Sequence, residues 1–136
     1  MLRPLHDKRP NPRSYDVKYI LLIYNNPAML ASFSKEEFDG VIGAVDTIMA
    51  ELTESGEWIG GEGLADSSQT RTVRVRDGVP AITDGPFVES KEQLAGYCLL
   101  ECETLERATD IAARWPDASF AAVELRPLMG QSGTEM

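Results

Sequence analysis

The segment from Val17 to Tyr24 places the strongest constraint on how this chain can fold. It reads VKYILLIY and is apolar at both odd and even positions. Successive side chains of a β-strand point to opposite faces of the sheet, so a strand of this kind needs cover on both sides. We therefore predict a central strand here, in a sheet that has a layer packed against each face.

A long amphipathic helix is predicted next, after a loop broken by Pro27. Ser34 and Glu37 form the sequence pattern of a capping box, and Gly56 is expected to follow the last turn. Between them, apolar residues recur at helical spacing. These residues are Phe38, Val41, Ile42, Val45, Ile48, Met49 and Leu52.

A second strand and a hairpin are predicted after this helix. Residues 57–64 (EWIGGEGL) resemble a strand in which the glycines indicate a bulge, or a close approach by another backbone or a ligand. Residues 70–76 (TRTVRVR) alternate, Asp77-Gly78 is a strong tight-turn pair, and residues 79–83 return. Pro80 favours an edge position for the returning strand.

The remaining third of the chain predicts two more strands and a helix. Ser90 and Gln93 form a weaker capping box around one expected helical turn, and residues 95–103 form a long strand. Thr104 caps a helix that Pro116 stops, and residues 121–128 form the last strand.

The order of these elements predicts an α+β fold. With the hairpin treated as an insertion, the order is β-α-β twice, which is the ferredoxin-like arrangement of an antiparallel sheet with two helices on one face. Two helices leave the other face of the sheet bare, although the first strand is apolar on both faces. We therefore expect a homodimer in which two copies pack sheet against sheet.

Charge divides the chain into an arm and a body. Residues 1–16 carry four basic and two acidic residues, three prolines and the single histidine, His6, and we expect a disordered basic arm there. Binding of a polyanion by this arm is the alternative. Residues 17–128 form the predicted domain and residues 129–136 a frayed tail. Residues 17–136 hold nine basic and 20 acidic residues, which disfavours nucleic acid as a partner.

The two cysteines and the lack of long apolar runs indicate a cytoplasmic protein. Cys98 and Cys102 share one face of a strand at a separation of about 13 Å, taking ~3.3 Å per residue, which is too far for a disulfide. Reduced thiols are typical of the cytosol. No apolar run approaches the ~18 residues of a spanning helix, and the arm has no apolar stretch of the kind that a secretory signal requires.

The tetrapeptide Asp84-Gly85-Pro86-Phe87 predicts a rigid turn, because a carboxylate that can bind nearby amides precedes a glycine free to adopt positive φ and a proline. Further segments accompany it in order. They are LLIY (21–24), GEGL (61–64), TDGPF-x-E-x-KE (83–92), GY (96–97) and VELRP (123–127). Together they resemble the YCII-related family, in its DGPF branch, over roughly residues 17–128.

This resemblance implies a dimeric α/β-barrel built from ferredoxin-like subunits. Most members of this family have no assigned function. The resemblance implies a His-Asp pair in a cleft for some members, and one relative is a dehydrochlorinase that acts on aromatic substrates. The first helix here contains no histidine, so that pair cannot be carried over. Some DGPF proteins are encoded beside alternative sigma factors, which implies a link to transcription.

Asp84 is the candidate catalytic acid or base, since a carboxylate in a rigid turn beside an apolar side chain can have a shifted pKa. The alternative is that it serves the turn itself. Glu62, amid three glycines, is a candidate ligand-binding residue. Glu89 and Lys91 could contact a ligand, or could be solvated charges beside a helical turn.

Aromatic side chains supply the remaining candidates. Trp58, Tyr24 and Tyr97 could line a pocket for an aromatic or apolar ligand, or belong to the core. Glu124 and Arg126 share one strand face and are expected to form ion pairs. The domain lacks histidine and paired cysteines, so we expect neither a metal site nor a cofactor.

Two functional hypotheses follow. The first is a homodimer that binds a small organic ligand in a cleft near Asp84, with acid/base chemistry that needs no cofactor. The second is a regulatory or interaction module linked to transcription, whose acidic surface meets a protein partner.

Overall fold

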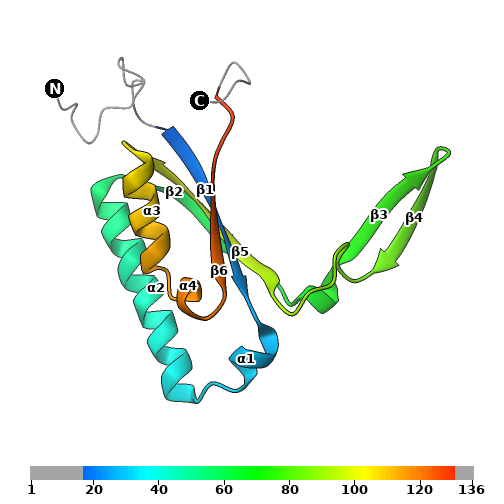
Figure 1. Cartoon of the computed structure of the whole chain (residues 1–136), viewed down its shortest axis with the longest axis horizontal. Coiled ribbons are helices and arrows are strands. Elements are labelled where there is room, and N and C mark those ends of the chain that lie inside the picture. The colour runs from blue at the N-terminus through cyan, green and yellow to red at the C-terminus, as the bar shows by residue number, and fades with distance from the viewer. Residues whose placement is uncertain (1–16, 131–136) are drawn as a thin grey trace.

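A computed structural model of the chain describes residues 17–130, so the predicted basic arm (1–16) and most of the predicted tail lie outside the described residues. The fold is α+β, with one four-stranded antiparallel sheet and a separate two-stranded ribbon (Figure 1). The sheet has the strand order β2-β5-β1-β6. Its strands are β1 (Val17–Asn25), β2 (Trp58–Gly63), β5 (Gln93–Cys102) and β6 (Ala122–Pro127). The ribbon consists of β3 (Arg71–Arg76) and β4 (Val79–Asp84).

The helices pack on one face of the sheet. They are α1 (Pro27–Ala31), α2 (Lys35–Ser55), α3 (Leu105–Arg114) and α4 (Asp117–Phe120), with a 3-10 turn at Ser67–Gln69. The core lies between this face and the two longer helices, where Leu21 and Leu100 meet Leu52 of α2 and Ile111 of α3. All four side chains are fully buried.

The opposite face of the sheet, which we call the outer face, contributes nothing to this core. Ile20 pairs with Leu99, and Leu22 pairs with Tyr97. Directly opposed residues of an antiparallel pair lie on the same face, so these four side chains form an apolar stripe across the two central strands. They are only partly covered within the chain. Of the two covering layers predicted for β1, the helices therefore supply one, and the outer face stays only partly covered within residues 17–130.

The sequence signals of the main helices are confirmed. Ser34 and Glu37 form the capping box in both directions, at 3.0 Å and 2.8 Å. Gly56 ends α2 with a left-handed φ of 82°. Thr104 caps α3 by accepting a hydrogen bond from the Arg107 amide.

Two local predictions are wrong. The loop at Pro27 is the short helix α1, because Asn26 accepts hydrogen bonds from two amides of its first turn and proline is well suited to a first helical position. Ser90 and Gln93 begin no helix. The Gln93 side chain binds the Ser90 carbonyl oxygen, and its backbone already starts strand β5.

A bulge at Gly60 and the neighbouring strand at Gly61 account for two of the glycines of β2. The register shifts between Trp58 and Gly60, as expected of a bulge. At Gly61, a Cβ would lie 2.6 Å from the Tyr97 carbonyl oxygen and 2.8 Å from the Cβ of Cys98. The close approach predicted there is therefore made by another backbone.

The hairpin is confirmed, including its tight turn, where Asp77 and Gly78 have φ of 52° and 76°. Its ribbon projects away from the sheet and helices (Figure 1). One chain forms an open sheet, not a closed barrel. The barrel implied by the family resemblance is thus not formed by a single subunit, because β2 and β6 are edge strands that do not meet.

Candidate functional site

A cavity of about 500 Å³ lies on the helix-covered side of the sheet, and we call it the helix-face cavity. Its walls are mainly apolar and come from α1, α2, α4 and the ends of three strands. They include Leu30, Phe38, Val45, Met49, Leu64 and Phe120. Trp58 and Trp115, the only two tryptophans of the chain, also border it. A largely apolar hollow of this size suits a small organic molecule.

One buried carboxyl group borders this cavity. Asp117 is only 7% exposed, and it is the first residue of α4, directly after Pro116. Burial raises the pKa of the Asp117 carboxyl, while a hydrogen bond from its own backbone amide and one from the Asn25 side chain act in the opposite direction. Asn25 also borders the cavity. Asp117 can therefore bind or exchange a proton in a mostly apolar setting.

Three predicted site residues border the helix-face cavity, in two different ways. Trp58 pairs with the core residue Leu100, so its side chain lies on the helix-covered face. Glu62 pairs with Tyr97, whose strand neighbour Cys98 is in the core. Because side chains alternate along a strand, Glu62 and Tyr97 point to the outer face and border the cavity through their main chains.

Tyr24 lies elsewhere, on the outer face. Its hydroxyl donates a 2.9 Å hydrogen bond to Glu124, which raises the pKa of the tyrosine. Both residues line a groove of about 460 Å³ between the outer face and the segment that follows β4. Pro86 and Val88 form the other side of this groove. We call it the arm-root groove, because it lies where the projecting β3–β4 ribbon joins the rest of the chain. Within residues 17–130, Glu124 therefore binds Tyr24 and forms no ion pair with Arg126, and pairing of these charges across a dimer stays a prediction.

Asp84 is the last residue of β4, at the root of the projecting ribbon, and is opposite Arg71. Backbone atoms of the next residue hold the turn: the Gly85 amide donates to the Thr70 carbonyl at 2.8 Å, and the Gly85 carbonyl accepts from the Thr72 hydroxyl at 2.7 Å. Gly85 has a φ of 96°, which glycine adopts readily. Asp84 is exposed and borders neither the helix-face cavity nor the arm-root groove.

Glu89 and Lys91 are exposed, in the segment between β4 and β5. Their neighbours Ser90 and Glu92 line the arm-root groove, but these two residues do not. The predicted site residues are thus divided between the two hollows and the ribbon root. They do not converge on Asp84.

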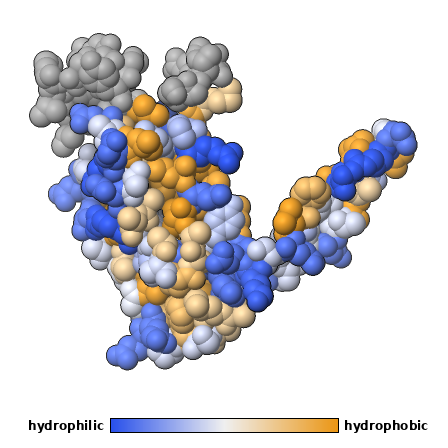
Figure 2. All heavy atoms as spheres, viewed as in Figure 1, coloured by the Kyte–Doolittle hydropathy of each residue, from blue (hydrophilic) through white to orange (hydrophobic). Residues whose placement is uncertain are grey.

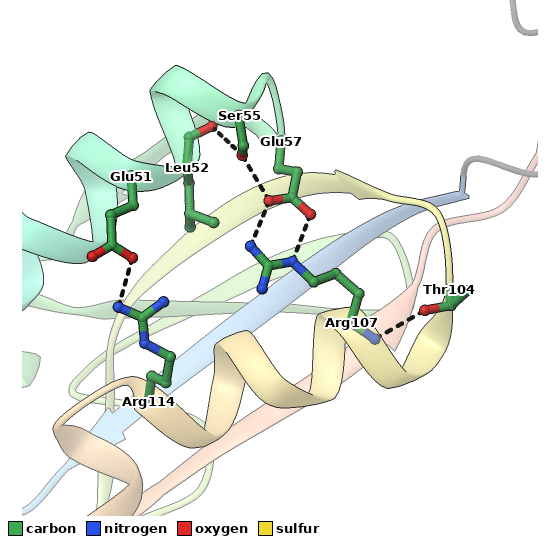
Figure 3. A network of polar contacts seen from close by, with 7 residues as sticks. All are labelled: Glu51, Leu52, Ser55, Glu57, Thr104, Arg107 and Arg114. Carbon is green, nitrogen blue, oxygen red and sulfur yellow. Dashed lines mark hydrogen bonds and ion pairs between the residues drawn. The ribbon is translucent and has the colours of Figure 1, made fainter. Parts of the chain in front are cut away.

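A polar network elsewhere joins the helices (Figure 3). Arg107 of α3 binds Glu57 through two hydrogen bonds of 2.8 Å, and Ser55 donates to the same carboxylate at 2.7 Å. Because of these bonds, above all those from Arg107, the pKa of Glu57 is lowered. A second ion pair joins Arg114 to Glu51 at 2.7 Å. These contacts fix α3 to the end of α2 and border neither hollow.

Comparison with known proteins places the chain in a family. Residues 17–130 match the family model of the YCII-related domain. The chain belongs to the YCII-related family. An uncharacterized protein of Rhizobium meliloti (strain 1021) is 33% identical over 112 residues, which cover 81% of this chain and 90% of that protein. The family recognised from the sequence is confirmed, and the relative named here carries no assigned activity.

Two features that are absent from residues 17–130 bear on the site of this YCII-related chain. No group of three or more His, Cys, Asp and Glu side chains in that range is placed to hold a metal ion. Within the same range, no helix is both long enough and apolar enough to cross a membrane.

Sequence reasoning missed Asp117 and Asn25. The sequence predicts that Pro116 ends the preceding helix, and it assigns no role to Asp117. The available signal was the order Trp115-Pro116-Asp117, in which proline both ends one helix and begins another. Nothing local in the sequence indicates that Asn25 lies beside it, since this contact spans almost the whole domain.

Proposed function

We propose that this YCII-related protein is a cytoplasmic homodimer of ferredoxin-like subunits that binds a small, largely apolar organic molecule in the helix-face cavity. The observation that carries the proposal is the buried Asp117 carboxyl in that cavity. An apolar wall supplies binding energy, and a single polar group inside it fixes the orientation of the ligand.

The chemistry follows from the protonation of Asp117. Burial favours its neutral form, so near the raised pKa the group can donate a proton, and above it the carboxylate can accept one. Asn25 would hold the carboxyl in a fixed orientation. This arrangement needs no cofactor and supports acid/base chemistry on a ring-sized ligand that carries a hydroxyl or an amine.

Two features support the subunit arrangement. The order β2-β5-β1-β6 of antiparallel strands, with helices on one face, is the pattern of ferredoxin-like domains. The outer face carries the apolar stripe of Ile20, Leu22, Tyr97 and Leu99, which a second copy would cover. Cys98 is a buried free thiol, in keeping with a reducing compartment.

The test uses the two cavity tryptophans as reporters. Phenol and benzylamine are titrated separately into the protein, and tryptophan fluorescence is recorded. We expect at least one of them to change the emission in a saturable way. We also expect Asp117→Asn, which keeps the size of the side chain, to weaken that binding about tenfold, because a buried polar group that loses its hydrogen-bond partner costs about 1–3 kcal/mol.

The matched control is Asp110→Asn, which removes an exposed carboxylate from α3. It should leave both binding and melting temperature unchanged. The proposal fails if no probe binds saturably, or if Asp117→Asn binds as tightly as the control while both remain folded.

A further inference from the structure

The β3–β4 ribbon, which we call the arm, has two chemically different faces. Val73 pairs with Ile82, and Val75 pairs with Pro80, so these four side chains share one face. We call this the apolar arm face. The other face carries Arg74 and Arg76, opposite Ala81 and Val79.

Nothing in residues 17–130 covers the apolar arm face. Val73, Val75 and Ile82 are 59%, 58% and 60% exposed. The arm joins no other strand, and apolar and polar surface alternate along it in space-filling view (Figure 2). An isolated two-stranded hairpin is at best marginally stable in water. An arm with a bare apolar face therefore needs a surface to pack on.

The root of the arm keeps it away from its own body. The two hydrogen bonds of Gly85 tie the end of β4 to Thr70 and Thr72 at the start of β3. From this fixed root the arm extends outward (Figure 1). No segment of residues 17–130 packs on its apolar face, which leaves that face open to another molecule.

From these observations we propose that the arm of each subunit packs its apolar face on the second copy of the chain in the dimer. This inference rests on the homodimer of the proposed function and assigns a role to the arm within it. The first argument is position. The arm-root groove places Pro86 and Val88, just after the arm, beside Tyr24 and Glu124 of the outer face. A copy that covers the outer face therefore lies next to the root of the arm.

The second argument is area. The four strands β1, β2, β5 and β6 have nine, six, ten and six residues, which at about 3.3 Å per residue and about 4.8 Å between strands give the outer face a footprint of only about 500 Å². Stable interfaces bury about 800 Å² per partner. One arm face adds roughly 200 Å² by the same spacings, and each subunit both gives an arm and receives one. The two arms together supply the missing area.

The third argument is charge. Residues 71–84 hold three of the nine basic residues between 17 and 130 and carry a net charge of +1, whereas the rest of that range carries −11. The β3–β4 arm, with its net charge of +1, is attracted to the acidic sheet and helices of a second copy. That attraction opposes the repulsion between the two acidic subunits.

The experiment compares two double variants of the same hairpin by sedimentation equilibrium. Val75→Thr with Ile82→Thr makes the apolar arm face polar; Val79→Thr with Ala81→Thr changes the opposite face. Threonine retains the strand preference of valine and isoleucine, so both variants keep the hairpin. We expect the first to raise the dimer dissociation constant at least about 100-fold, since four side chains per dimer lose apolar burial, and the second to change it less than about threefold.

Each outcome decides the inference. If the two variants change the dimer dissociation constant equally, or not at all, the inference about the arm is overturned while the homodimer stands. The arm would then serve some other partner. A wild-type chain that sediments as a monomer at micromolar concentration overturns both this inference and the homodimer. Ligand binding in the helix-face cavity is measured separately by tryptophan fluorescence, so its failure can be distinguished from that of the arm.

Discussion

Replacing Gly61 by alanine should destabilise the protein, whereas the same change at Gly63 should not. Both glycines lie in β2 and have φ outside the left-handed region, so neither substitution strains the backbone itself. They differ in what a new Cβ would meet. At Gly61 it would lie 2.6 Å from a carbonyl oxygen and 2.9 Å from a Cα of β5, whereas at Gly63 no atom lies within 4 Å.

The magnitude follows from these distances. An ordinary contact begins near 3.4 Å, so the strands must separate by several tenths of an ångström along atoms that also form the sheet. Overpacking of this kind costs about 1–3 kcal/mol. Loss of chain entropy in the unfolded state offsets about 0.4–1 kcal/mol of this. The net change for Gly61→Ala is thus about 1–2 kcal/mol of lost stability, and Gly63→Ala should gain about 0.5 kcal/mol.

Urea unfolding monitored by tryptophan fluorescence, to which Trp58 of the same strand contributes, measures this difference directly. In thermal unfolding, Gly61→Ala should melt about 6–10 °C below Gly63→Ala, taking about 4 °C per kcal/mol for a domain of this size. Equal stabilities would refute the reasoning. The close approach at Gly61 would then not be set by β5, and the alternative that the glycines admit a ligand would regain support.

Two further predictions concern titratable groups in the core and beside it. Glu57→Gln should cost about 1 kcal/mol of unfolding free energy at pH 7. The pKa of Glu57 is lowered from 4.5, chiefly by Arg107, so its contribution to stability is present above that value and fades as the pH falls through the lowered pKa. The stabilities of wild type and variant, measured by urea unfolding, should therefore converge in acid. The more exposed pair supplies the control: Glu51→Gln should cost under about 0.5 kcal/mol at either pH. Burial raises the pKa of Cys98 to about 12, so at pH 8 a thiol reagent should label the native protein at least about 100-fold more slowly than the urea-unfolded chain; equal rates would contradict the burial of both cysteines.

The sequence predicted the elements well because their signals are local. The capping box at Ser34, the left-handed glycine at position 56 and the Asp77-Gly78 turn each depend on a few consecutive residues, and all three are confirmed. The helix expected at Ser90 failed for the opposite reason. There the backbone is already committed to pairing with β1, which overrides a weak local cap.

The candidate site was harder to predict because it depends on long-range neighbours. Alternation within β2 and β5 predicts that Glu62 and Tyr97 share a face. Which face that is follows only from the packing of α2 and α3. Asp117 acquires its raised pKa from burial by elements that are distant in sequence, and no spacing rule contains that information.

The Asp84-Gly85-Pro86-Phe87 segment is best understood through the backbone of its second residue. Gly85 bonds to Thr70 and Thr72, so the segment closes the base of the arm and directs it outward. Phe87 then lies against Arg74 of the arm, with the guanidinium carbon 5.3 Å from the ring centre. If the arm packs on a second subunit, this segment sets the angle at which it does so. A fixed angle would require the same turn chemistry whatever ligand the cavity holds, so the motif can mark a shared mode of assembly without specifying a shared reaction.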